Sequence, residues 1–363
     1  MAQMVKAFRS MFGRGMQGKR ITCPRIGSLL LLFLVLHCLD GYGEPAHKGA
    51  LEGQVYYLST ERTRVSNTRV ASTHRVVSLR KGREFPIFES TKPIDGIAIS
   101  NSGEKLALSQ WKKLTLIDTA GNILEPIDLS HRVRMQFINW SPGDDKLYYA
   151  DFETRKADES EWYVVSSDRE NVPVESIYNI YEYDIRNGKE RRLTNYTEGN
   201  SISDMILLRD GTTIIYLLGK PGIRSEMNEL IQLDIGSGAS SAIGFQGGTL
   251  ASGSTGKEVL VVSQSGQPVG NEITDSSSQS STLYIFDLET HEARSILKAD
   301  WVGDLAMNRQ GNEILLFKSF ESGGGYPNWS LFHFDLTNKK LSSLLKRDKK
   351  IRSHVMWYAP GKA

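Results

Sequence analysis

Apolar and polar positions alternate along residues 50–363 in short segments rich in Val, Ile, Leu, Tyr and Phe, and turns with Gly, Asn or Asp separate them. This alternation is typical of β-strands, and tight turns between such segments indicate β-hairpins. One hairpin pattern recurs: an apolar strand that ends in Asp, one more apolar residue, a polar turn and a second short strand. Val76–Gly82 is a degenerate first copy without the Asp. The other copies, spaced by 66, 50, 53 and 48 residues, contain Asp118, Asp184, Asp234, Asp287 and Asp335.

A second pattern alternates with the first and consists of an apolar strand, a turn with Gly or Asp, and another apolar strand. Its copies span residues 97–108, 138–149, 205–216, 250–261 and 305–316, and a sixth begins at Val355. Two hairpins in each unit of about 50 residues give four strands, and radial repetition of such units makes a β-propeller.

The second pattern resembles the Trp-Ser-Pro-Asp-Gly repeat of TolB-type propellers, which are built from WD40-like repeats of the PD40 type. The resemblance is closest at Trp140-Ser141-Pro142 and weakest in the copy that begins at Leu250, and it covers residues 50–363. It implies a six-bladed propeller. No functional residue of TolB has a matching position in this chain, and we expect no room for the α/β domain that precedes the TolB propeller.

The first and last units are incomplete in complementary ways. The strand at Gln54–Leu58 and the hairpin at Val76 have no innermost strand before them, whereas Val355–Tyr358 has no strand after it. We therefore expect the C-terminal strand to complete blade one and to close the ring without an unpaired edge. The predicted fold class is all-β, a six-bladed β-propeller with four-stranded blades. A two-sheet sandwich and an open β-solenoid are the alternatives, and the regular units with a split first blade argue against both.

The first 43 residues differ from the rest of the chain. Six basic residues precede an apolar run at Ile26–Leu36, and Gly41-Tyr42-Gly43 follows. This is the pattern of a secretory signal peptide cleaved before Glu44, and the run is shorter than the roughly 20 residues that span a bilayer. Lipidation at Cys38 and a retained signal anchor are the alternatives. We expect a signal peptide at 1–43, a propeller at 50–363, a periplasmic or secreted protein, and membrane contact only through an uncleaved signal.

Removal of this leader changes the charge of the protein. The chain has 44 basic and 42 acidic side chains; the leader holds six and one of them, so 38 and 41 remain, a net charge of −3. A slightly acidic body argues against non-specific nucleic-acid binding, which needs a concentrated positive surface. Both cysteines, Cys23 and Cys38, lie in the leader. The sequence therefore excludes a thiol nucleophile, a disulfide and a cysteine metal site from the body.

Insertions between the second and third strands of the blades should emerge on one face, because the strands of a blade alternate in direction. Long loops in a compact domain are often functional. Two of the insertions combine aromatic and charged residues, a composition found in protein contacts. The insertions cover about residues 59–74, 152–178, 219–228, 263–281 and 319–328. The candidates for partner binding are Arg155, Glu161, Trp162, Tyr163, Tyr326 and Trp329. The alternative is that 152–178 is a hairpin that only lengthens blade three.

Asp204, Asp304 and His354 occupy corresponding positions just before the innermost strands of blades four, six and one. Near the propeller axis they would converge into a polar cluster at the mouth of the channel. Carboxylates with a histidine suit a divalent cation, so a metal site stays open. The other three blades carry no ionisable residue at this position, and a surface or capping role is the alternative.

The sequence contains no Gly-x-Ser-x-Gly elbow, no His-Glu-x-x-His pair and no Gly-rich phosphate loop. It therefore predicts an exported, non-enzymatic scaffold without a cofactor, which binds a protein, or an envelope glycan, through its long-loop face. The alternative is a propeller enzyme, a hydrolase or lyase that acts on a sugar or lactone near the central channel. Catalytic residues dispersed over several blades would give no local motif.

Overall fold

The structure is a computed structural model. All residues that it describes lie in the part of the chain from His47 to Ala363. They contain no helix of the length and apolarity that a bilayer crossing requires. The predicted signal peptide lies outside them. The described residues are 51, 53–66, 70–129, 131–132, 134–156, 163–165, 171–220, 228–252, 256–265, 280–300, 302–308, 310–320, 328–345 and 351–358.

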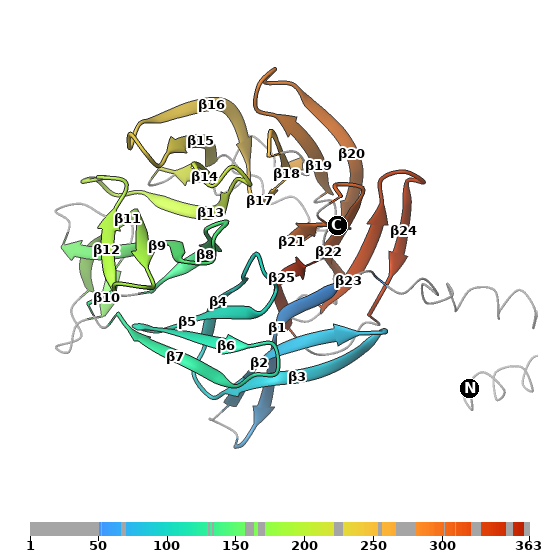
Figure 1. The fold of residues 1–363 in the computed structure, drawn as a ribbon, viewed down its shortest axis with the longest axis horizontal. Coiled ribbons are helices and arrows are strands. Elements are labelled where there is room, and N and C mark those ends of the chain that lie inside the picture. Colours follow the sequence, from blue (N-terminus) through green and yellow to red (C-terminus); the bar gives the residue numbers. More distant parts are fainter. Residues whose placement is uncertain are drawn as a thin grey trace, which may run out of the picture. The chain divides into compact units, whose positions relative to one another are not determined.

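Six antiparallel sheets surround a common axis as the blades of a propeller (Figure 1). The strands of each blade follow one another from the innermost to the outermost. Blade one consists of β25 (Ile351–Tyr358), β1 (Gln54–Arg64), β2 (Val70–Arg80) and β3 (Arg83–Ser90). Blade two consists of β4 (Ile94–Ile99), β5 (Lys105–Gln110), β6 (Lys113–Asp118) and β7 (Ile123–Asp128). Blade three consists of β8 (Gln136–Trp140), β9 (Lys146–Lys156), β11 (Asn171–Asp184) and β12 (Lys189–Arg192), with β10 (Tyr163–Val165) paired to β11.

The other three blades have four strands each in simple sequence order. Blade four consists of β13 (Ser201–Leu207), β14 (Thr213–Gly219), β15 (Asn228–Asp234) and β16 (Ser240–Gly247). Blade five consists of β17 (Thr249–Ser252), β18 (Glu258–Ser265), β19 (Ser280–Asp287) and β20 (Ala293–Asp300). Blade six consists of β21 (Val302–Met307), β22 (Glu313–Phe320), β23 (Asn328–Asp335) and β24 (Lys340–Ser343). The predicted fold class is confirmed.

The C-terminal strand closes the ring as predicted. β25 pairs antiparallel with β1, from Gln54 opposite Tyr358 to Thr60 opposite Ile351. Val355 and Trp357 are buried in an apolar cluster that also contains side chains of blade six. The strand therefore supplies both the missing inner edge of blade one and part of its contact with blade six.

Apolar side chains fill the space between each pair of neighbouring blades. Tyr56 and Tyr57 are both fully buried, although they point to opposite faces of β1: Tyr56 packs toward blade two and Tyr57 toward blade six. Similar clusters occupy the other four interfaces. A polar contact supplements this packing where the indole Nε1 of Trp140 donates to the carbonyl oxygen of Ala98 in blade two at 3.1 Å. Each blade is thus buried on both of its faces.

The recurring Asp of the hairpin pattern caps the turn between the third and fourth strands. Oδ1 of Asp118 accepts bonds from the backbone N–H groups of Ala120 and Asn122, at 2.9 and 2.8 Å. The Asn122 side chain, followed by these N–H groups, holds the pKa of Asp118 below its ordinary value. A short acidic side chain that binds its own turn is a common way to stabilise a hairpin. A similar arrangement, with bonds from N–H groups two or three positions further on, occurs at Asp184, Asp234, Asp287 and Asp335.

Two insertions are largely strands rather than loops, which for residues 152–178 agrees with the alternative of a hairpin that lengthens blade three. In blade one, β1 continues to Arg64 and β2 begins at Val70, with paired residues up to Arg64 opposite Val70. In blade three, β9 and β11 remain paired up to Lys156 opposite Val174. Polar residues in these extensions do not show the apolar alternation from which strands were predicted, which explains the difference.

Removal of the C-terminal strand should open the ring. We expect a chain that ends before Ile351 to melt at a temperature lower by about 10 °C or more, because both blade one and its contact with blade six lose buried apolar surface. Thermal unfolding followed by circular dichroism measures the change. A chain that ends after Tyr358 is the control and should melt like the full chain. Equal melting temperatures for all three chains would contradict ring closure by β25.

Two glycines in corresponding turns of blades one and two provide a test of the contact between these blades. Both have positive φ, +72° at Gly82 and +93° at Gly121, but a Cβ at Gly121 would lie 1.7 Å from the carbonyl oxygen of Ile87, whereas one at Gly82 would meet nothing. Gly82→Ala should cost about 1–2 kcal/mol of unfolding free energy, the strain of a left-handed alanine. Gly121→Ala should cost clearly more, since backbone must move. Chemical denaturation of both variants measures this difference, and equal costs would contradict the contact.

Candidate functional site

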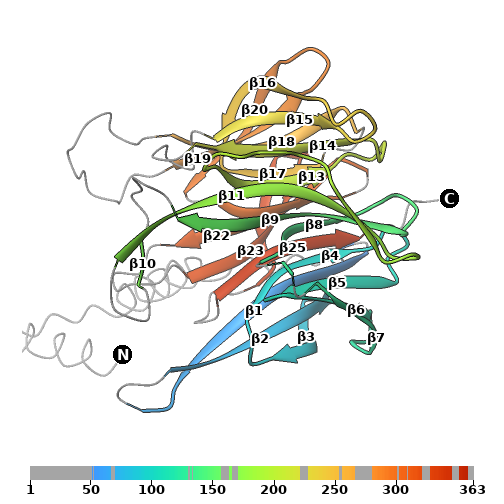
Figure 2. The ribbon, with the colours of Figure 1, turned by 90° about the vertical axis from the view of Figure 1, so that its left-hand side faces the viewer.

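The two faces of the propeller differ. We call the face where the second and third strands of each blade join the long-loop face, and the opposite one the tight-turn face. The β1–β2 and β9–β11 hairpins both extend beyond the blades on the long-loop face, as Figure 2 shows. Between them, blade two ends in the short turn that joins β5 to β6. The long-loop face is therefore uneven, with two projecting hairpins on either side of a short blade.

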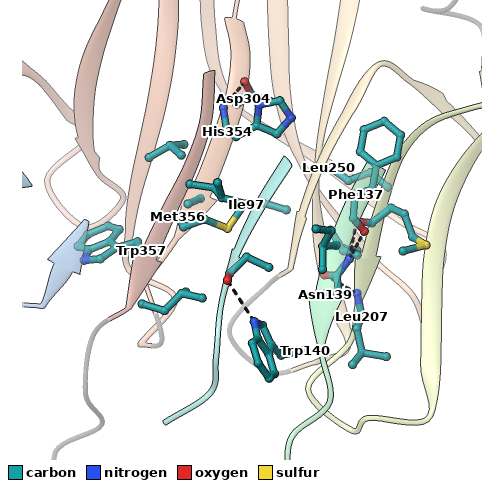
Figure 3. Close-up of a pocket in the computed structure, with 18 of the residues that line it drawn as sticks. Ile97, Phe137, Asn139, Trp140, Leu207, Leu250, Asp304, His354, Met356 and Trp357 are labelled. Atoms are coloured by element: carbon teal, nitrogen blue, oxygen red, sulfur yellow. Dashed lines mark hydrogen bonds between the residues drawn. The ribbon is translucent and has the colours of Figure 1, made fainter. Parts of the chain in front are cut away.

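A central cavity of about 430 Å³ lies along the axis and is lined by the innermost strands of all six blades (Figure 3). Much of its wall is apolar and includes Ile97, Phe137, Leu207, Leu250 and Met356. Asp204, Asp304 and His354 line it at the mouth on the long-loop face, and Arg209 and Tyr358 line it towards the opposite end. The cavity wall thus combines apolar side chains with polar groups, and its ionisable side chains lie towards its ends.

The structure brings Asp204, Asp304 and His354, the candidates for a polar cluster, to the wall of this one cavity. They do not precede the innermost strands but lie inside β13, β21 and β25, at or beside a break in strand register. Blades two and three have similar irregularities at the start of β4 and in β8. These bulges place corresponding residues at the cavity mouth.

Both carboxylates bind backbone N–H groups of the next blade. Oδ2 of Asp204 accepts a bond from the N–H of Leu250 in blade five at 2.7 Å, and Oδ2 of Asp304 accepts one from the N–H of His354 in blade one at 2.8 Å. Figure 3 shows the second of these contacts. Asn139 joins blades three and four in a similar way, through the backbone of Met205 and Leu207. These side chains therefore tie consecutive innermost strands together.

Burial raises the pKa of Asp204 to about 7, and the negative charge of Asp304 adds to the effect against the two backbone donors. A carboxyl group with such a pKa exchanges its proton near neutral pH, which is a property of many general acids and bases. Among the described residues, no group of three His, Cys, Asp or Glu side chains is arranged to hold a metal ion.

Two bulky residues at the mouth adopt a left-handed backbone. The φ angles are +53° at Phe137 and +54° at His354. Such conformations cost about 1 kcal/mol or more for residues with a Cβ and are concentrated at functional sites and bulges. The His354 imidazole is held by Nδ1 at 3.0 Å from Oγ of Ser353. The geometry of the mouth is therefore maintained by the surrounding ring rather than by local preference.

A network of charged side chains connects blades two and three on the same face. The Arg134 guanidinium binds the buried Asp95 carboxylate at 2.8 Å, and the Arg134 backbone N–H donates to Oδ1 of buried Asp151 at 2.7 Å. Arg132 stacks on the Tyr181 ring at 3.6 Å from its centre and binds Glu190. No local sequence pattern marks these residues, because their pairing depends on segments that are distant along the chain.

The predicted partner-binding residues fall largely outside the described part of the chain. Arg155 lies in β9, Tyr163 in β10 and Trp329 in β23, but their side chains are outside it. Glu161, Trp162 and Tyr326 lie outside it entirely. These six candidates stay predictions.

One described aromatic on this face was missed. Trp111, in the turn between β5 and β6, is 59% exposed. The sequence signal that could have identified it is a tryptophan followed by two lysines in the short turn between two strands.

Comparison with solved structures identifies proteins with the same fold. TolB from Acinetobacter baumannii matches 94% of this chain over 74% of its own length, with 16% identity and a TM-score of 0.56. A putative TolB from Agrobacterium tumefaciens matches 84% of this chain over 98% of its own, with 12% identity and a TM-score of 0.51. The structure of oligogalacturonate lyase in complex with manganese matches 80% of this chain over 85% of its own length, with 12% identity and a TM-score of 0.51.

No protein-family model matches the sequence, and comparison with curated proteins gives no match. At these identities the similarity defines the fold alone. The chain has the fold of a TolB-like six-bladed β-propeller.

The raised pKa of Asp204 predicts a pH-dependent stability. The folded protein retains a proton that the unfolded carboxyl, with a pKa near 3.9, releases between about pH 4 and 7, so this group's contribution to unfolding free energy falls as pH rises through that window. The stability of the wild type relative to Asp204→Asn should therefore be lower at about pH 8 than at about pH 5. Urea denaturation at both pH values measures it. Asp304→Asn is the control. Its unfolding free energy should still fall as pH rises, but by less than that of the wild type, because Asp204 is retained without the neighbouring charge. A difference in unfolding free energy between the wild type and Asp204→Asn that is the same at both pH values would contradict the prediction.

Proposed function

We propose that this chain is an exported, non-enzymatic propeller that binds a protein partner through its long-loop face. The observation that carries the proposal is the pair of hairpins, β1–β2 and β9–β11, that project from this face. Val65 and Val70 lie at the described ends of the first hairpin, and their side chains are 60% and 58% exposed. Apolar side chains on projecting elements suit a contact with another protein better than an interface with water.

The channel mouth supports the same proposal. Asp204 and Asp304 accept hydrogen bonds from the backbone of neighbouring blades, which is a structural use of these carboxylates. Export rests on the basic and apolar pattern of residues 1–43, which suits a signal peptide and a periplasmic location. The similarity to TolB structures is consistent with a scaffold, since it concerns the whole propeller.

A second candidate function is that of an enzyme acting on a sugar at the channel. One observation favours it: Asp204, with a pKa near 7, faces a cavity of about 430 Å³. The similar fold of oligogalacturonate lyase adds a chemical class of substrate, an acidic oligosaccharide. If this function holds, Asp204→Asn abolishes cleavage of such a sugar, whereas hairpin changes leave cleavage intact.

Shortening the hairpins should remove partner binding without unfolding the propeller. Replacing residues 153–177 by Asn-Gly leaves Phe152 paired with Tyr178, and replacing 61–73 leaves Thr60 paired with His74. Asn-Gly favours the two-residue turn that such a pair needs. We expect affinity capture from envelope extract to recover a protein with the full chain and at least about tenfold less of it with the double variant.

The control is a chain with Lys81→Glu and Lys339→Glu, two exposed positions on the tight-turn face. It should capture the partner as the wild type does. Equal melting temperatures show that the shortened chain is folded. Recovery of the same protein by the shortened chain, or of none by the wild type, would contradict the proposal and direct the search to sugars.

A further inference from the structure

Blade two presents a basic and aromatic surface on the long-loop face. Trp111 and Lys112 form the turn between β5 and β6, Lys113 begins β6, and all three are exposed. The Gln110 amide fixes the neighbouring segment, because its Nε2 donates to Oγ of Ser90 at 2.8 Å and lies 3.5 Å from the carbonyl oxygen of Lys92. Exposed Lys92 is therefore held beside the turn. We call Trp111, Lys112, Lys113 and Lys92 the blade-two surface.

The hairpin of blade one adds to this surface. Tyr56, Leu58 and Val76 pack toward blade two, and residues two apart on a strand point to the same side. Arg62 and Arg64 therefore lie on the blade-two side of the hairpin. On β2, exposed Val70 and half-buried His74 lie on this side as well, and the fields of Asp95 and Arg62 both act on the imidazole. Burial lowers the pKa of His74, so its imidazole is not counted as a cation.

Positive charge predominates on this surface. Among the described residues, none of the three lysines of the blade-two surface has an ion-pair partner. Two carboxylates are nearby: Asp128 lies opposite Lys113 in the β6–β7 pair, and Glu153 lies on the side of β9 that faces blade two. Asp95 is bound by Arg134 and is nearly buried. Outside the leader the chain has a net charge of −3, so this basic surface stands out from the rest of the body.

We propose that the blade-two surface, with the adjoining side of the β1–β2 hairpin, docks an acidic segment of a protein partner that also carries apolar side chains. The lysines attract carboxylates and increase the rate of encounter. Trp111 provides a large exposed aromatic side chain, the residue type that most often dominates binding energy at interfaces. Exposed Val70 favours a peptide over an acidic polysaccharide, because a polysaccharide has no apolar side chains to contact it. This inference rests on the proposed function and assigns its contact site.

The test places a photo-crosslinking residue, p-benzoylphenylalanine, at position 111 of the full chain expressed in cells. Illumination of these cells, followed by purification and mass spectrometry, identifies what lies against this position. We expect an adduct with a protein segment rich in Asp and Glu with neighbouring apolar residues. The same residue placed at Lys81 on the tight-turn face is the control and should give no such adduct.

Charge variants test the recognition itself. Lys92→Glu, Lys112→Glu and Lys113→Glu together should lower the adduct yield at least about tenfold and reduce its dependence on salt, whereas the corresponding Lys→Arg changes retain it. The matched control reverses three exposed lysines of the tight-turn face, Lys81, Lys189 and Lys339, and should have no effect. All six lysines are exposed, so we expect every variant to fold. Melting temperatures equal to that of the wild type would confirm this.

Three results would overturn the inference. They are an adduct with carbohydrate, an adduct with a basic or neutral segment, and the absence of any adduct at position 111. The affinity capture with full and shortened hairpins separates the two proposals. If the full chain still captures a protein that the shortened chain does not, but no adduct forms at position 111, the scaffold function stands and only this contact site is wrong. If capture also fails, both proposals fall.

Discussion

The structure depends on the burial of both faces of every sheet. A four-stranded sheet that is apolar on both sides has no stable exposed form, so each blade needs a neighbour on either side, and the ring must close. Closure falls to β25, which lies more than 270 residues after the strand with which it pairs. Adjacent residues such as Tyr56 and Tyr57 show the consequence, since one packs on blade two and the other on blade six.

The ring also determines the backbone conformation and the hydrogen bonds of the residues near its axis. Five of the innermost strands contain a bulge, and the carboxylates of Asp204 and Asp304 at these bulges bind the backbone of the neighbouring innermost strands. Left-handed backbone at Phe137 and His354 is tolerated because the surrounding strands fix it. The channel mouth combines structural hydrogen bonds with a carboxyl group that exchanges its proton near neutral pH, so stability and any chemistry at this point are coupled.

The two faces of the propeller follow different rules. On the tight-turn face, a repeated Asp caps nearly identical turns, which leaves little variation for recognition. On the long-loop face, the blades differ in length, and the short blade two lies between two projecting hairpins. Unequal blades expose Trp111 and its lysines, and the local basic charge contrasts with the net charge of −3 that residues 44–363 carry. Differences among repeats, rather than the repeats themselves, provide the surface for a partner.

The sequence by itself determined the hairpins, the blade count and the closing strand, because strand alternation and Asp-containing turns are local and repeat along the chain. Alignment of the repeats also gives Asp204, Asp304 and His354 corresponding positions in their blades. Their hydrogen bonds to residues 46 and 50 positions away were decided only by the tertiary structure, since bulges and the ring set those distances. The length of the β1–β2 hairpin escaped prediction because its polar residues lack the apolar alternation. Trp111 escaped it because its exposure depends on how far the neighbouring blades extend.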